Sequence, residues 1–115
     1  NLLVFFSNLK HILKKIKNLQ KSAIKSKADG LILAQKGIAT RTSKIDLLKT
    51  INSPVLFIIG KQDSRIQLDV AIAQASFPKH SEILILENVG HMGHIESREI
   101  IKQRLLSFTY SCFAI

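Results

Sequence analysis

The chain has 115 residues, about the size of one small domain; 46% of its residues are hydrophobic and 22% are charged. This balance excludes a chain that is disordered by composition, although the core must be modest at this length. The formal net charge of +9 fits an anionic partner, but the aromatic content of 6% and the absence of tryptophan argue against base stacking, so we expect no nucleic-acid partner.

Residues 1–44 show only helical patterns. Residues 8–26 are predicted to form a basic amphipathic helix, with lysines opposite an apolar face. This face holds Leu9, Ile12, Leu13, Ile16, Leu19 and Ala23. Residues 28–41 favour a shorter helix, and residues 42–52 a short helix or turn. The first helix is typical of one that packs an apolar face on its own protein; docking on a membrane or a partner is the alternative.

From residue 53 onward, strand-like and helical patterns alternate. Residues 53–63 and 81–90 contain continuous apolar runs, which are typical of strands buried on both faces of a parallel sheet. Residues 68–78 and 97–108 have helical spacing. The order predicts a βαβα unit with parallel strands. Because two parallel strands cannot cover both faces and both edges, we expect the end of a larger α/β domain, whose open sheet edge would also allow self-association.

Ionisable residues follow the carboxyl ends of both predicted strands. Asp63 lies three residues after Gly60, and His91 directly follows Gly90. Each residue alone is more typical of a turn or a surface loop. Parallel strands, however, end at the same edge of a sheet, where ligands gather. We therefore predict a carboxylate–imidazole pair in which Asp63 fixes the tautomer of His91 and leaves the other ring nitrogen free as a base.

A metal site is the alternative interpretation of the second loop. His91, His94 and Glu96 are residue types that bind zinc or iron. The spacing is not the His-Glu-x-x-His signature, Gly93 interrupts it, and no cysteine lies nearby. We therefore expect neither a metal nor another cofactor.

The stretch "SPVLFIIGKQD" followed by "ILILENVGHMGHIES" resembles the C-terminal end of α/β-hydrolase-fold proteins. In that family the penultimate strand reads Pro-Val-Leu-x-Ile-x-Gly-x-x-Asp. The last strand leads into Gly-His, often followed by a second histidine or an aromatic residue and a glutamate. The similarity covers roughly residues 45–108, and more weakly residues 30–41. It implies an α/β fold in which residues 1–44 are a cap-like helical region and residues 45–115 the C-terminal part of the hydrolase core.

Carried over by position, the resemblance implies that Asp63 is the acid and His91 the general base of a nucleophile–histidine–acid triad. His94 and Met92 would line the site, and Glu96 would support the loop. The implied activity is that of an esterase-like serine hydrolase acting on a small ester-like substrate. The family commonly has a proline four residues after the acid, where this chain has Gln67.

The nucleophile elbow, Gly-x-Ser-x-Gly, does not occur in the sequence, and neither does the family's oxyanion-hole loop. Ser43 and Ser53 lie in unsuitable local sequence, the first in a polar helical segment and the second directly before Pro54. We therefore expect a C-terminal fragment that carries two members of the triad and is inactive alone.

A second hypothesis is a non-catalytic basic interaction module with a degenerate hydrolase tail, based on the lysines of residues 8–27.

No apolar run approaches the roughly 18 residues of a membrane span. The run Leu2–Phe6 is too short for a signal-peptide core. Cys112 is the single cysteine, so no intramolecular disulfide can form and a reducing compartment is favoured. We expect a cytoplasmic location.

Overall fold

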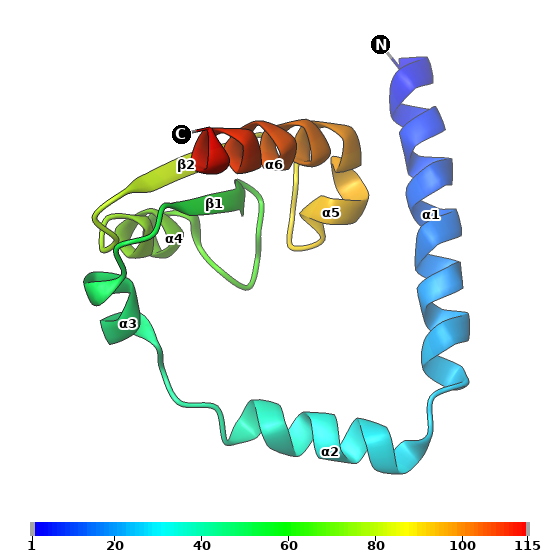
Figure 1. Ribbon diagram of the computed structural model, residues 1–115. Coiled ribbons are helices and arrows are strands. Elements are labelled where there is room, and N and C mark those ends of the chain that lie inside the picture. Colours follow the sequence, from blue (N-terminus) through cyan, green and yellow to red (C-terminus); the bar gives the residue numbers. More distant parts are fainter. Residues whose placement is uncertain (1, 115) are drawn as a thin grey trace. The chain divides into compact units, whose positions relative to one another are not determined.

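The computed structural model describes the backbone of residues 2–114 and the side chains of residues 9–114. Contacts divide the chain into two units, Asn1–Ser43 and Lys44–Ile115. The first unit contains α1 (Leu2–Ile24) and α2 (Ala28–Ala39). The second unit contains six elements (Figure 1), namely α3 (Ile45–Thr50), β1 (Val55–Gly60), α4 (Leu68–Ala75), β2 (Ser81–Leu86), α5 (Gly93–Glu96) and α6 (Arg98–Phe113).

Local hydrogen bonds close the ends of the two helices of the first unit. α1 extends beyond its predicted start, and a turn follows it in which the Ser26 N–H donates to the Ala23 carbonyl over 3.1 Å. α2 ends at Thr40, whose hydroxyl donates to the Lys36 carbonyl over 3.0 Å. Among the side chains that the structure describes, neither helix buries a residue. Tertiary packing normally supplies most of the stability of such helices. The first unit by itself does not provide it, because the apolar faces of both helices stay mostly exposed.

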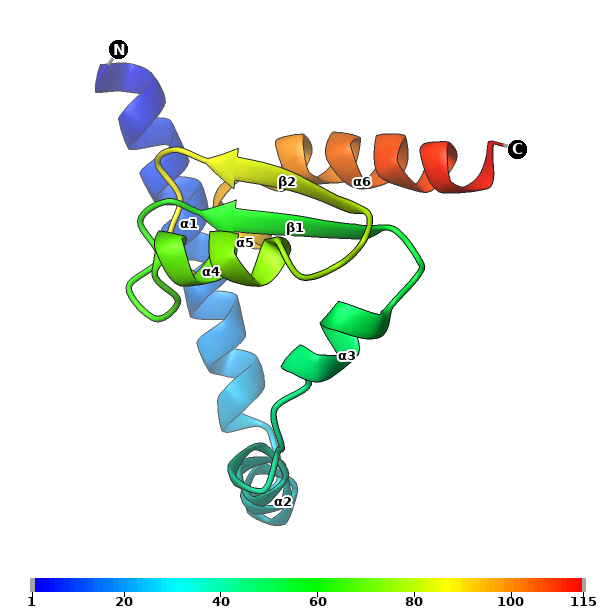
Figure 2. The same cartoon turned by 90° about the vertical axis from the view of Figure 1, so that its left-hand side faces the viewer.

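The second unit is a mixed α/β arrangement built on a two-stranded parallel sheet. β1 pairs with β2 in a continuous register from Val55↔Ser81 to Gly60↔Leu86, which confirms the parallel pairing predicted from the strand–helix–strand order. α4 is the crossover between the strands. Figures 1 and 2 show α4 on one side of the sheet and α6 on the other, so each face receives one helix.

The core lies mainly between the sheet and α6. Leu86, Val89 and Ile101 form its buried cluster, and Ile58 and Leu84 pack against it. On the opposite face the buried residues are Ile59 of β1 and two alanines of α4, Ala71 and Ala75. The alanines are four residues apart and so share one helix face. Their small side chains allow α4 to approach the sheet closely.

The strands are less buried than predicted. Burial along β2 alternates, and Ile83 and Ile85 keep 41% and 39% of their surface exposed. The expectation of a strand buried on both faces is therefore wrong for β2, whereas β1 is half-buried throughout and buries Ile59. The physical reason is that the short helix α4 is the element packed on this face of a sheet that has only two strands in the described part of the chain.

The region after β2 also differs from the prediction. The four-residue helix α5 was not expected, and α6 continues five residues past its predicted end at Phe108. The hydroxyl of Thr109 donates to the Leu105 carbonyl, and that of Ser111 to the Phe108 carbonyl, both over 2.8 Å. These bonds accommodate polar residues inside the helix. Within residues 2–114 no helix is both long and apolar enough to cross a membrane.

Candidate active site

The loop after β1 holds the carboxylate of Asp63 in a fixed orientation. Its Oδ1 atom accepts the backbone N–H groups of Arg65 over 2.8 Å and of Ile66 over 3.0 Å. This is the turn chemistry that aspartate provides after a strand. The turn occupies one carboxylate oxygen and leaves Oδ2 for another partner.

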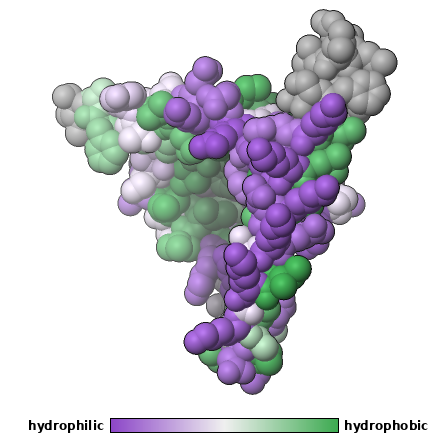
Figure 3. All heavy atoms as spheres, turned by 90° about the vertical axis from the view of Figure 1, so that its right-hand side faces the viewer, coloured by the Kyte–Doolittle hydropathy of each residue, from purple (hydrophilic) through white to green (hydrophobic). Residues whose placement is uncertain are grey.

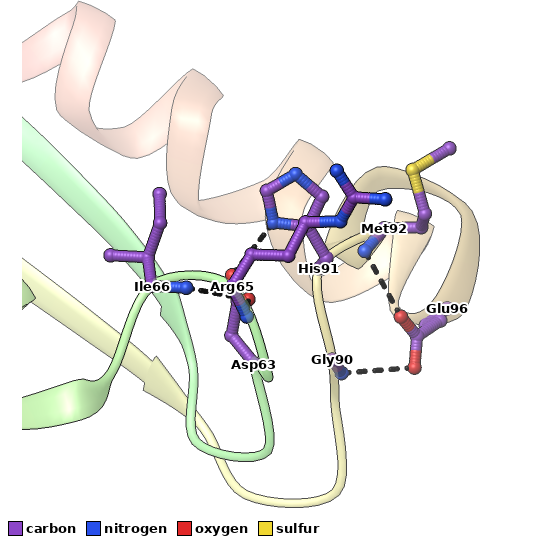
Figure 4. A network of polar contacts seen from close by, with 7 residues as sticks. All are labelled: Asp63, Arg65, Ile66, Gly90, His91, Met92 and Glu96. Atoms are coloured by element: carbon purple, nitrogen blue, oxygen red, sulfur yellow. Dashed lines mark hydrogen bonds and ion pairs between the residues drawn. The ribbon is translucent and has the colours of Figure 1, made fainter.

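That partner is His91, as predicted (Figure 4). The Nδ1 atom of His91 lies 2.9 Å from Oδ2 of Asp63. The Asp63 side chain is 11% exposed and the His91 side chain 44% exposed, so the carboxylate sits beneath a more accessible imidazole. The two residues meet because β1 and β2 are parallel and their carboxyl ends lie at one edge of the sheet.

The charge of Asp63 determines which nitrogen of His91 carries the proton. The hydrogen bond from His91 lowers the pKa of Asp63 from 3.8 to about 2, and the backbone N–H groups of Ile66 and Arg65 act in the same direction. Desolvation opposes the change but is outweighed. An ionised carboxylate can only accept, so Nδ1–H of His91 must donate. The Nε2 atom has no hydrogen-bond partner among the described residues, so in neutral His91 its lone pair is free to act as a base.

Glu96 clamps the backbone on both sides of His91. Its Oε2 atom accepts the N–H of Gly90 over 3.0 Å, and its Oε1 atom accepts the N–H of Met92 over 3.2 Å (Figure 4). Hydrogen bonds to a charged acceptor are among the stronger ones in proteins. The prediction that Glu96 supports the loop is consistent with these bonds, although their pattern of one residue before and one after His91 was not foreseen.

Gly60 allows the two loops to approach each other, a role that sequence reasoning missed. The Lys61 N–H donates to the Leu86 carbonyl over 2.9 Å, and the Gln62 N–H to the Val89 carbonyl over 3.0 Å. A Cβ atom at Gly60 would lie 2.6 Å from the Val89 carbonyl oxygen, closer than van der Waals contact permits. The signal in the sequence was a glycine directly after a continuous apolar run.

An open, mainly apolar pocket lies beside the pair. Asp63 and His91 contribute to its wall, together with Phe57, Ile59, Ile66 and Ala71. Binding sites of this kind combine an apolar lining with a few polar groups that orient the ligand. A small apolar group bound here would lie next to the imidazole of His91.

The two other predicted site residues lie elsewhere in the loop region. His94 belongs to α5 and lines a separate surface hollow that it shares with Arg98 and Leu105. The Met92 side chain extends away from the Asp63–His91 pair (Figure 4). Neither residue is among those that line the pocket beside the pair.

A metal site needs several histidine, cysteine or carboxylate side chains close together. Nowhere in the described part of the chain do three or more histidine, cysteine, aspartate or glutamate side chains gather closely enough to hold a metal ion. Glu96 is instead engaged with backbone N–H groups. The metal alternative therefore gains no support from the geometry.

No model of a known protein family matches this chain, and no curated protein sequence gives a significant match. The resemblance of residues 45–108 to the α/β-hydrolase fold therefore stays a prediction. What the structure adds is the local geometry around Asp63 and His91.

Proposed function

We propose that Asp63 and His91 are the acid and the general base of a nucleophile–histidine–acid triad in an α/β-hydrolase-type enzyme. The nucleophilic serine would come from a part of that enzyme outside these 115 residues. The observation that carries the proposal is the 2.9 Å contact between Asp63 Oδ2 and His91 Nδ1, which leaves Nε2 without a partner among the described residues.

The proposed reaction is the hydrolysis of a small ester in two steps. The Nε2 atom of His91 takes the proton of the serine hydroxyl while the serine oxygen attacks the carbonyl carbon of the ester. His91 then gives that proton to the departing alcohol. Water, activated in the same way, releases the acid from the acyl-enzyme. Asp63 stays ionised throughout and stabilises the imidazolium that forms twice in the cycle, which its lowered pKa supports.

The apolar pocket supports the choice of a small acyl substrate. Phe57, Ile59 and Ile66 offer an apolar surface next to His91, where an acyl chain could pack. The clamp by Glu96 supports a positioning role, because it holds the backbone N–H groups on either side of His91. Glu96 does not itself line the pocket and bonds to the backbone N–H groups of Gly90 and Met92, so its effect would be exerted through the loop.

The first experiment reads the coding sequence upstream of Asn1 for an in-frame Gly-x-Ser-x-Gly and expresses the longer frame that contains it. Hydrolysis of p-nitrophenyl acetate and butyrate would then be compared for the wild type, His91→Ala, Asp63→Asn and the control His94→Ala. We expect both triad variants to lose about 10³- to 10⁴-fold in kcat, and the control to stay within about tenfold. Full activity of His91→Ala would overturn the proposal.

The second experiment uses the 115-residue chain itself. Its rate of ester hydrolysis is expected to be the same for the wild type and His91→Ala, because the base has no nucleophile to activate. Robust turnover by this chain that disappears in His91→Ala would show that the chain supplies its own nucleophile, contrary to the proposal.

A further inference from the structure

Over residues 9–24 most of the apolar face of α1 is exposed within its own unit, and Ile12 is half-buried. Leu9, Leu13, Ile16 and Leu19 each keep between 40% and 48% of their surface accessible. A helix with a continuous apolar stripe ordinarily buries it against the rest of its protein. No described side chain of α1 or α2 is buried, so the first unit by itself leaves this stripe exposed.

The charge on α1 is of one sign only. The helix carries Lys10, Lys14, Lys15, Lys17 and Lys21, and the first acidic residue of the chain is Asp29. No intrahelical ion pair can therefore neutralise the lysines. Figure 3 shows hydrophilic side chains following the length of this helix, with apolar side chains beside them. The surface of α1 thus combines an uncovered apolar stripe with an unbalanced positive charge.

The lysines also border the stripe on both sides. With about 100° between successive residues, the stripe from Leu19 to Leu13 spans about 120° of the helix circumference. Lys15 lies at one border of the stripe and Lys17 at the other. A lysine beside an apolar face can lay its methylene stem along that face while its ammonium group stays in a polar layer.

We propose that α1 lies in the plane of a membrane surface that contains anionic lipids, with its apolar stripe among the upper acyl chains and its lysines at the phosphate groups. Such a surface is the partner that is both negatively charged and apolar just below. No helix among the described residues is long and apolar enough to cross a bilayer. At 23 residues, α1 would cover about 35 Å of the surface. The inference does not depend on the proposed hydrolase site.

Two other partners fit the same helix less well. A nucleic acid would satisfy the lysines but would leave four large aliphatic side chains exposed, and residues 9–24 contain no phenylalanine, tyrosine or tryptophan for base stacking. An amphipathic helix of another protein would need an acidic polar face to match the lysines, whereas an anionic bilayer presents negative charge on every side of the stripe.

The test uses the whole 115-residue chain and sedimentation with two kinds of vesicle. One kind is pure phosphatidylcholine, and the other contains roughly a third phosphatidylserine. We expect the chain to bind the anionic vesicles, and this binding should weaken steeply between about 0.05 M and 0.5 M salt. Binding to the neutral vesicles should be weak. The backbone amides of α1 should become better protected from hydrogen exchange when the chain binds.

Two variants separate the apolar and the charged contributions. Leu13→Gln with Ile16→Gln removes part of the stripe, and Lys14→Gln with Lys17→Gln and Lys21→Gln removes three charges. Each is expected to weaken binding at least about tenfold. The matched control, Lys36→Gln with Lys44→Gln and Lys102→Gln, removes the same charge outside α1 and should change binding less than about threefold. All substituted side chains are exposed or half-exposed, so the unfolding of the second unit should not change.

Several outcomes would overturn the proposal. These are absence of binding to anionic vesicles at low salt, equal binding to both kinds of vesicle, or an unaltered affinity of the Leu13→Gln, Ile16→Gln variant. Binding of a DNA duplex without any binding of vesicles would identify a nucleic-acid partner instead. An equal loss of affinity in the lysine variant and its control would show that net charge alone matters and would remove the role of α1.

Discussion

The Nδ1–H group of His91 donates to Oδ2 of Asp63 over 2.9 Å, although the two residues are 28 positions apart in the chain. Their meeting depends on the parallel pairing of β1 and β2 and on two further backbone bonds, from Lys61 to Leu86 at the end of β2 and from Gln62 to Val89 in the loop that follows.

Replacing His91 by alanine should raise the pKa of Asp63. The value is expected to move from about 2 toward 3.8 but to stay below it, because the N–H groups of Ile66 and Arg65 still donate to the carboxylate. The shift would be followed by NMR titration of the Asp63 carboxyl carbon. His94→Ala is the control and should leave the midpoint at about 2. An unchanged midpoint in His91→Ala would contradict the assignment of the main cause.

The same hydrogen bond predicts a pH dependence of stability. A carboxylate whose pKa is lowered in the folded state contributes stability above its unfolded pKa of 3.8 and loses that contribution as the pH falls toward about 2. The free energy of unfolding should therefore decrease over this window, and less so in His91→Ala. Urea unfolding at a series of pH values measures both. A decrease of equal size in the two proteins would argue against a contribution from the pair.

Gly60→Ala should destabilise the second unit and separate the two loops. The added methyl group would meet the Val89 carbonyl oxygen at 2.6 Å, and overpacking of this kind costs about 1–3 kcal/mol. Gly37→Ala is the matched control, since its new methyl group would meet nothing within 4 Å and should raise the helicity of α2. Urea midpoints of both variants provide the comparison. Wild-type stability of Gly60→Ala would show that the loops can move apart freely.

Glu96→Gln should loosen the loop around His91. Glutamine has one acceptor oxygen and presents an NH₂ group to the second backbone donor, so one of the two N–H groups of Gly90 and Met92 loses its partner. Loss of a charge-assisted hydrogen bond corresponds to about 1.5–3 kcal/mol. Faster hydrogen exchange at these two amides is the expected signature.

Glu87→Gln supplies the comparison for Glu96. Glu87 forms an exposed ion pair with Lys61, and such pairs contribute at most about 1 kcal/mol. Its removal should leave the exchange of Gly90 and Met92 unchanged. If the two variants accelerate exchange equally, the clamp by Glu96 has no special role.

α6 should be held on the sheet mainly by Ile101 and much less by Arg104. Ile101 is 9% exposed and packs with Leu86 and Val89, so its replacement by alanine should cost about 2–4 kcal/mol. Arg104 pairs with Glu82 at a partly exposed position, and Arg104→Ala should cost less than about 1 kcal/mol. Urea unfolding checks this, because Ile101→Ala should have a lower midpoint than Arg104→Ala. A lower midpoint for Arg104→Ala would show that the ion pair is the main anchor.

The local pattern of the chain was sufficient to predict β1, β2 and their parallel pairing. Two continuous apolar runs, separated by a stretch with helical periodicity, predict a strand–helix–strand unit. The helical crossover between the strands makes them parallel. The proximity of Asp63 and His91 followed from the same rule, because each residue comes shortly after the end of its strand. These features depend on residues close together in the sequence and on one general rule of topology.

Other features were decided only by atoms that come together in the folded chain. The clamp of Glu96 and the contact at Gly60 depend on backbone groups of particular loops, whose conformations are set by hydrogen bonds that no periodicity reports. Likewise, apolar spacing identifies a face that favours burial, but not what covers it. Ile83 of β2 remained exposed for this reason, since burial depends on the neighbours that the tertiary structure provides.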